Sequence, residues 1–287
     1  MTDDDDAVAI YRAIQGQARS EQTKTGKPVD TSKLFTRHLL ESFLDRLARS
    51  EHADDFVLKG GVLLAAYGVR RPTKDLDAEA IGADVSVGHL RQVVSDVVAV
   101  EASDGIEFDL DTLTIREIRD DAEYPGLRLR MKARLATWNG VTAWDVSTGD
   151  PIVPAPHRVR LPRIHGEDIV VLGYRPETTI AEKGVTILER GITSTRWRDY
   201  VDIVQLFGCF GIDDQQLVEA ARAVAAYRQV ELDAVAPLLA GYGALAQPKW
   251  AAWRRKERLE EMCAERLDDQ VAQVAALLDP VFSIGRV

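Results

Sequence analysis

The sequence predicts an α+β protein, in which a mixed β-sheet is flanked by helices and followed by an all-helical C-terminal domain. Three patterns indicate this fold. Short apolar strands alternate with amphipathic helices in the first half, an Asn-Gly pair inside an alternating segment is typical of a β-hairpin, and helical periodicity continues from residue 176 onward. We therefore expect a partly ordered N-terminal segment (1–30), a core domain (31–175) and a helical domain (176–287).

The individual elements follow from periodicity and from turn residues. Leucines at helical spacing follow Thr31 and Ser32, either of which can cap the first helix. Gly60-Gly61 separates a short strand from the next helix. In the core, the expected helices cover 31–47, 62–67 and 86–101, and the expected strands cover 56–59, 75–79, 106–116, 127–135, 141–147 and 169–172. In the C-terminal domain, the expected helices cover 177–191, 196–208, 214–227, 231–243 and 248–278.

Composition and charge exclude several classes of protein. With 46% hydrophobic and 29% charged residues the chain has a globular composition, and no apolar run reaches the roughly 18 residues that cross a bilayer. The acidic start, Asp3 to Asp6, is unlike a basic signal peptide, so we expect a cytoplasmic protein without a membrane partner. Cys209 and Cys263 lack metal-binding spacing, which disfavours a disulfide scaffold and a structural zinc site. A net charge of −10 argues against a broadly basic surface but not against a local basic groove.

Residues 127–147 predict a hairpin with one basic face. Apolar residues alternate there with four cations, Arg128, Arg130, Lys132 and Arg134. A two-residue turn at Asn139-Gly140 would place Arg134 opposite Asp145 on the returning strand, and cross-strand partners share a face. We therefore expect Asp145 on the basic face of the hairpin.

Two aspartates, Asp75 and Asp77, are the first candidate catalytic residues. They are two positions apart on an expected strand, so their carboxylates point to the same face. Charges on a buried strand are costly unless they are compensated, and Mg²⁺ is a common compensation because it prefers carboxylate oxygens. Two such ions, ~4 Å apart, would activate an attacking hydroxyl and stabilise a leaving pyrophosphate.

A third carboxylate from a neighbouring strand would complete this metal site. Asp145 is the candidate that the hairpin predicts, and Asp150 or Glu107 would replace it in a different register. An isolated Asp-x-Asp more often marks a solvated edge strand, but here it follows a strand–Gly-Gly–helix unit. Gly60 and Gly61 would let the backbone approach a phosphate closely, and a tight turn without a ligand is their alternative role. They do not form a P-loop, because no Gly-Lys-Ser/Thr follows.

Taken together, these motifs resemble one enzyme family. Lys59-Gly60-Gly61, the pattern Arg71-x-Thr73-x-Asp75-x-Asp77 and the later Asp145 are similar to the signature of the AbiEii/AbiGii nucleotidyltransferase toxins, the MenT-like toxins of type IV toxin–antitoxin systems. These toxins belong to the DNA-polymerase-β-like nucleotidyltransferase superfamily. The family also has a helical lysine and an Arg-Asp-x-x-Asp segment, which Lys183 and residues 198–202 match here. The resemblance spans roughly residues 35–207.

The resemblance implies a fold and a reaction. The sheet would be that of a polymerase-β-like nucleotidyltransferase core. The enzyme would use Mg²⁺, with two ions expected, to transfer a nucleotide from an NTP to an RNA acceptor, the tRNA 3′ end in particular, and so block translation. A cognate antitoxin protein would restrain it, and the chain would act as a monomer. The alternatives are a nucleotidyltransferase that modifies a protein or a small molecule such as an antibiotic, and a non-catalytic nucleotide-binding module.

The resemblance also implies the roles of individual residues. Asp75, Asp77 and Asp145 would bind Mg²⁺, and Lys183 would contact the triphosphate as a further catalytic residue. The expected nucleotide-binding residues are Lys59, Gly60, Gly61, Arg71, Thr73, Asp199 and Asp202. Asp199 and Asp202 share a helix face. They would either orient Lys183 or Arg190, or form salt bridges with Arg196 or Arg198.

A basic segment near the C-terminus, 249–258, indicates a second contact with RNA. It combines five cations and one acid with two tryptophans, and such residues suit phosphates and unpaired bases. The expected RNA contacts are Arg254, Arg255 and Lys256, together with Arg128, Arg130, Lys132 and Arg134. The alternative is a charged helix whose tryptophans, Trp253 above all, anchor the core.

Overall fold

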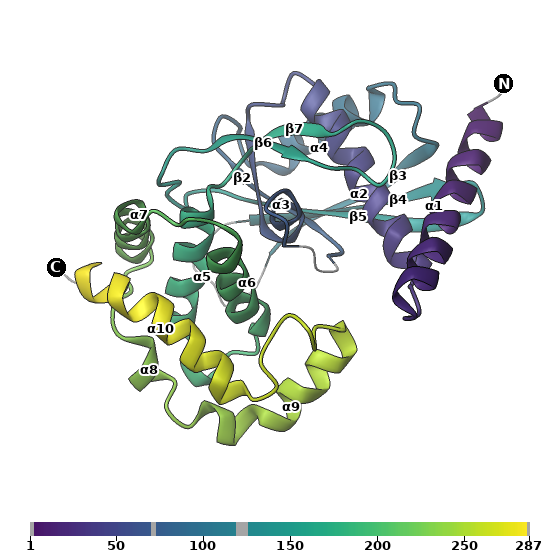
Figure 1. The fold of residues 1–287 in the computed structure, drawn as a ribbon. Helices are drawn as coiled ribbons and strands as arrows, with labels where there is room; N and C mark the ends of the chain where they lie inside the picture. Colours follow the sequence, from purple (N-terminus) through teal and green to yellow (C-terminus); the bar gives the residue numbers. More distant parts are fainter. Residues whose placement is uncertain (1–2, 70–72, 119–125, 286–287) are drawn as a thin grey trace. The chain divides into compact units, whose positions relative to one another are not determined.

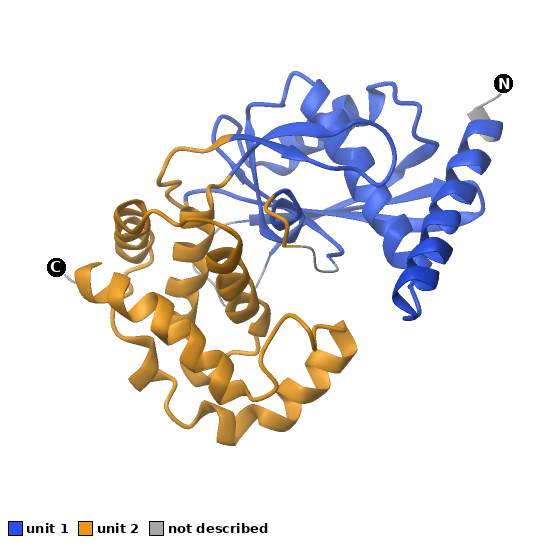
Figure 2. Ribbon diagram, viewed as in Figure 1, with its two compact units in different colours: residues 1–66, 72–149, 158–173 blue, residues 67–71, 150–157, 174–287 orange. Residues whose placement is uncertain are grey.

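The computed structural model describes residues 3–69, 73–118 and 126–285 and divides into two compact units (Figure 1, Figure 2). The sheet unit contains residues 1–66, 72–149 and 158–173, and the helical unit contains residues 67–71, 150–157 and 174–287. Arg71, one of the predicted nucleotide-binding residues, lies outside the described residues.

The sheet unit contains the strands and helices that the sequence predicts, together with its first helix and its sixth strand, which the sequence does not predict. Its helices are α1 (Asp3–Thr25), α2 (Thr31–Arg49), α3 (Gly60–Ala66) and α4 (Val87–Ala99). Its strands are β1 (Phe56–Lys59), β2 (Leu76–Ala80), β3 (Ile106–Glu117), β4 (Gly126–Leu135), β5 (Trp138–Ser147), β6 (His157–Leu161) and β7 (Ile169–Gly173). The predicted α+β class is confirmed, and β6 is a strand that the sequence analysis missed.

The seven strands form one mixed sheet in the order β3-β4-β5-β2-β1-β7-β6. Strand β2 pairs antiparallel with β1 and parallel with β5, and β5 pairs antiparallel with β4. Alternation gives the sheet an apolar face, where α2 packs: the rings of Phe43 and Trp144 lie 5.4 Å apart between their centroids. The opposite face carries the polar residues of β1, β2, β4 and β5, which include the candidate site.

The β4–β5 hairpin turns three residues earlier than predicted. Its loop is Ala136-Thr137, with Ala136 at φ +50°, so Asp145 pairs with Arg128 and not with Arg134. Gly140 lies inside β5, where a Cβ atom would come within 2.7 Å of Trp138 Cζ3. The Asn-Gly signal was therefore misleading because this glycine makes room for an indole ring. The register shift of six residues is even, so the predicted face of Asp145 is retained.

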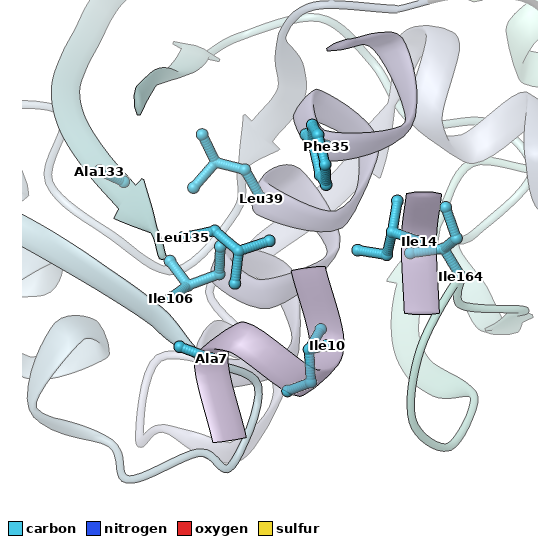
Figure 3. Close-up of a cluster of buried hydrophobic side chains, with 9 residues drawn as sticks. All are labelled: Ala7, Ile10, Ile14, Phe35, Leu39, Ile106, Ala133, Leu135 and Ile164. Carbon is cyan, nitrogen blue, oxygen red and sulfur yellow. The ribbon is translucent and has the colours of Figure 1, made fainter. Parts of the chain in front are cut away.

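The N-terminal segment, predicted to be partly ordered, forms helix α1. Its apolar residues recur at three- and four-residue spacing, Ala7, Ile10 and Ile14, and all three are buried (Figure 3). They pack against α2 through Phe35 and Leu39 and against the ends of β3 and β4. The difference arises because a narrow apolar stripe in a polar sequence is a weak local signal until a partner surface covers it.

The helical unit is built from α5 (Pro176–Arg190), α6 (Trp197–Cys209), α7 (Asp214–Tyr227), α8 (Val235–Leu238), α9 (Tyr242–Glu257) and α10 (Leu267–Gly285). The single helix predicted over 248–278 is two helices, because Arg258 adopts a left-handed conformation at φ +59°. The loop that follows is held by Arg254, whose guanidinium donates to the carbonyls of Glu260 and Cys263. The helix predicted over 231–243 shortens to α8 and the first turn of α9. Among the described residues, no helix has the length and apolar character needed to cross a membrane.

Candidate active site

Two of the three predicted metal-binding aspartates are neighbours on parallel strands. Asp77 of β2 and Asp145 of β5 are direct register partners, and their side chains share the polar face of the sheet. Asp75 lies directly before β2, and its Oδ1 accepts a hydrogen bond of 3.3 Å from the hydroxyl of Thr73. The parallel β2–β5 pairing thus brings together carboxylates that are far apart in the sequence.

Gly60 forms the elbow beneath Asp77. It joins β1 to α3 with φ +68°, and the preceding residue, Lys59, is the register partner of Asp77. A Cβ atom on Gly60 would lie 2.6 Å from Cγ of Asp77 and closer still to its Oδ2. Only glycine therefore allows the carboxyl group of Asp77 to occupy its observed position. The neighbouring Gly61 is buried in the first turn of α3.

Glu79 is a site residue that the sequence analysis missed. Its side chain is 1% exposed, it accepts a hydrogen bond of 2.9 Å from Lys59 Nζ, and it accepts one of 2.6 Å from Ser147 Oγ. Glu79 continues the alternation of Asp75 and Asp77, which was the signal available in the sequence. Lys59, predicted to bind the nucleotide, contacts this buried carboxylate in the structure.

Asp145 is held by an arginine of the adjacent strand. The guanidinium of Arg128 donates to both carboxylate oxygens, with distances of 2.8 and 2.6 Å, and the Arg128 side chain remains 46% exposed. The two alternative third acids lie elsewhere. Glu107 pairs with Arg134 on β3 and β4 at 2.8 Å, and Asp150 pairs with Arg228 in the helical unit at 2.9 Å.

In the helical unit, Lys183 binds both predicted aspartates. Its Nζ lies 2.6 Å from Asp199 Oδ1 and 3.0 Å from Asp202 Oδ2, joining α5 to α6. Arg196 adds a second ion pair to Asp199 at 2.8 Å. Burial acts to raise the pKa of Asp199, but the charges of Lys183 and Arg196 outweigh it and lower the pKa to about 2. Both arrangements left open by the sequence therefore occur at Asp199, whereas Arg198 pairs with Glu257.

Three of the four basic residues of β4 line a groove on the polar face of the sheet unit. Its volume is about 590 Å³, and its lining includes Arg116, Arg128, Arg130 and Lys132 with one acid, Glu117. The second basic segment differs from the prediction. Arg254 is buried and holds the α9–α10 loop, whereas Arg255 and Lys256 are exposed.

The two tryptophans of this second basic segment pack within the helical unit. Trp250 is fully buried, and its indole donates to the carbonyls of Ala264 and Glu265. Trp253 is half-buried and stacks on Trp250, with 5.2 Å between the ring centroids. These contacts match the alternative in which the tryptophans anchor the core.

The acids of the sheet unit have the donor type that suits a divalent cation. Asp75, Asp77 and Asp145 offer the hard oxygen donors that Mg²⁺ prefers, and Gly60 leaves space for the side chain of Asp77. Among the described residues, the group whose three ligand atoms lie within 4.8 Å of one another is a different one, Glu51, His52 and Asp96. His52 is already engaged there by Asp96 at 3.1 Å and by Asp55 at 3.4 Å.

Comparisons with known proteins extend these observations. A family model described as "Nucleotidyl transferase AbiEii toxin, Type IV TA system" matches residues 42–276, which include parts of both units. Among solved structures, the chain is similar to JHP933 from Helicobacter pylori, with 13% identity and a TM-score of 0.48 over 89% of this chain and 94% of that chain. It is also similar to an H. pylori protein described as a candidate nucleotidyltransferase, with 14% identity and a TM-score of 0.49 over 89% of this chain and 97% of that chain. The comparison with curated proteins gave no match.

Proposed function

Because this chain belongs to the AbiEii family of nucleotidyltransferase toxins of type IV toxin–antitoxin systems, we propose that it transfers a nucleotide from an NTP to RNA, specifically to the 3′ end of tRNA. The acceptor hydroxyl would attack the α-phosphate, pyrophosphate would leave, and the modified tRNA would no longer support translation. The observation that carries this proposal is the register pairing of Asp77 with Asp145 beside the Gly60 elbow. A cognate antitoxin would restrain the enzyme, which we place in the cytoplasm as a monomer.

In this proposal the acids of the sheet unit hold Mg²⁺, with two ions expected. Asp75, Asp77 and Asp145 supply the carboxylate oxygens, and Gly60 keeps the Asp77 side chain in place. When bound, the ion would neutralise negative charge on the phosphates and lower the pKa of the acceptor hydroxyl. The sheet unit is then the nucleotidyltransferase core and the helical unit the C-terminal domain of the predicted organisation.

Each unit contains residues that the sequence analysis predicts to contact the nucleotide. Lys183 would contact the triphosphate, and the carboxylates of Asp199 and Asp202 fix the position of its ammonium group, so these two act as positioning residues. Around the glycine elbow, the further nucleotide contacts would come from Lys59, Gly60, Gly61, Arg71 and Thr73. The exposed cations of β4 would contact the phosphates of the RNA, with Arg255 and Lys256 as a second surface.

Transfer of radioactive nucleotide tests the proposal. The purified protein is incubated with each of the four α-labelled NTPs, Mg²⁺ and total tRNA, beside the variants Asp77→Asn and Asp54→Asn. The second variant makes the same chemical change at an exposed acid of another ion pair. We expect the wild type and Asp54→Asn to label tRNA, and Asp77→Asn to lose at least about a hundredfold in rate because it removes a metal-binding charge.

The alternatives give different labelling patterns. Label in protein or in a small molecule, with none in tRNA, would favour the alternative acceptors. Binding of NTP without transfer to any acceptor would favour a non-catalytic module. Full activity of Asp77→Asn would show that the carboxylate pair is not the catalytic centre.

A further inference from the structure

The Arg128–Asp145 ion pair lies where the basic groove meets the carboxylate pair. Both oxygens of Asp145 accept hydrogen bonds from the Arg128 guanidinium, and Asp145 is at the same time the register partner of Asp77. A guanidinium in this position repels a divalent cation and competes for the same oxygens. Asp145 therefore gains full strength as a metal ligand only when Arg128 moves away.

The groove provides a place where an anion other than Asp145 can pair with Arg128. Arg128 is the register partner of Arg116 on β3, so the two side chains leave adjacent strands on the same face of the sheet. Like charges placed directly opposite are destabilising unless an anion lies between them. Neither Arg116, Arg130 nor Lys132 forms an ion pair with any residue that the structure describes. The groove of about 590 Å³ that these residues line with Arg128 thus carries four cations and one acid.

We propose that this groove binds a phosphate group between Arg116 and Arg128, and that this binding draws Arg128 from Asp145 and so strengthens metal binding at the carboxylates. The guanidinium groups of Arg116 and Arg128 would each donate N–H hydrogen bonds to the phosphate oxygens, as arginines commonly do with oxyanions. Arg128 is then a positioning residue that couples the two ligands, and the coupling is reciprocal. This inference rests on the proposed function, because it presupposes that the acids bind a metal.

The phosphate has two possible sources, and the experiment separates them. Binding of Mn²⁺ to the full chain is measured by electron paramagnetic resonance, alone and with a saturating dinucleoside monophosphate (ApA) or with AMP. ApA carries one phosphodiester, as an RNA acceptor does, and AMP carries a phosphomonoester, as a free nucleotide does. Wild type is compared with Arg128→Ala, with the charge-conserving Arg128→Lys and with Arg158→Ala. Arg158 provides a control because it is an exposed arginine of the same sheet, on β6, and it also forms an ion pair, with Asp54.

We expect Arg128→Ala to bind Mn²⁺ roughly threefold more tightly than wild type, the size typical of an exposed ion pair. Arg128→Lys should lie between the two, and Arg158→Ala should match wild type. ApA or AMP should tighten Mn²⁺ binding to wild type by a similar factor and leave Arg128→Ala unchanged. A response to ApA assigns the groove to the acceptor, and a response to AMP alone assigns it to the nucleotide.

Three results would overturn the inference. The first is equal Mn²⁺ affinity of Arg128→Ala and wild type. The second is equal tightening of Mn²⁺ binding by Arg158→Ala, which would show only that removing any positive charge from the sheet has this effect. The third is a phosphate response that persists in Arg128→Ala. If Mn²⁺ binds wild type but not Asp77→Asn while Arg128→Ala has no effect, the coupling alone fails. If Mn²⁺ binds none of these proteins, the metal site of the proposed function fails with it.

Discussion

Replacing Gly60 by alanine tests whether the glycine elbow positions the Asp77 carboxylate. Two penalties add in this variant. Gly60 has φ +68°, a left-handed conformation that costs an L-residue ~1–2 kcal/mol. The new methyl group would also lie 2.6 Å from Cγ and 2.8 Å from Cβ of Asp77, which is closer than carbon atoms can approach. The Asp77 side chain must therefore leave its position beside Asp145.

We expect Gly60→Ala to lower both the stability of the fold and the affinity for Mn²⁺. The free energy of unfolding in urea should fall by ~1–2 kcal/mol through the backbone term. Affinity for Mn²⁺, measured by electron paramagnetic resonance, should fall at least about tenfold, because even indirect supports of metal ligands are worth this much. Nucleotide transfer should fall with it.

Gly26→Ala separates the two parts. Gly26 has φ +67°, yet no atom lies within 4 Å of the position its Cβ would take. This variant should therefore lose similar stability while it binds Mn²⁺ like wild type. If Gly60→Ala and Gly26→Ala bind Mn²⁺ equally well, the reasoning that ties Gly60 to Asp77 is refuted.

Three further predictions concern stability. The lowered pKa of Asp199 stabilises the fold above the unfolded value near 3.8 by about 2 kcal/mol, and this contribution disappears as the pH falls toward 2. Urea titrations between pH 5 and 3 should thus show a smaller pH dependence for Asp199→Asn than for wild type, and equal slopes would contradict the assignment. Asp104→Asn should lose ~3–5 kcal/mol in urea unfolding, because it leaves the buried guanidinium of Arg46 without its carboxylate partner at 2.6 Å. A loss below about 1 kcal/mol would show that other groups satisfy Arg46. Gly140→Val should lose ~1–3 kcal/mol by displacing the ring of Trp138, and wild-type stability would argue against this packing.

The sequence was sufficient for those features that depend on alternation and local spacing. The separation of Asp75 and Asp77 and the even register shift of the hairpin both preserve which face a residue occupies. The face of Asp145 was therefore predicted correctly, although its predicted cross-strand partner was wrong. Helical spacing predicted that Asp199 and Asp202 share a face, the family resemblance supplied Lys183, and their contact was one of two predicted alternatives.

The features that were missed depend on contacts across the chain. Asn139-Gly140 has the composition of a turn, but the space needed by Trp138 determines the role of the glycine. Glu79 is visible as a charge on a strand, yet only the pairing with Lys59 and Ser147 shows why it is buried. Local sequence carries no information about such partners, and the break between α9 and α10 has the same origin.

The parallel pairing of β2 with β5 determines when Asp77 and Asp145 can come together during synthesis of the chain. Strands β1 and β2 can pair as soon as both have left the ribosome, but Asp77 meets Asp145 only after β3, β4 and β5 have also emerged. A nascent chain that stops anywhere between these two aspartates lacks the carboxylate pair, even when β1 and β2 are already paired. Under the proposed function, prematurely terminated translation products of this length would therefore not transfer nucleotides.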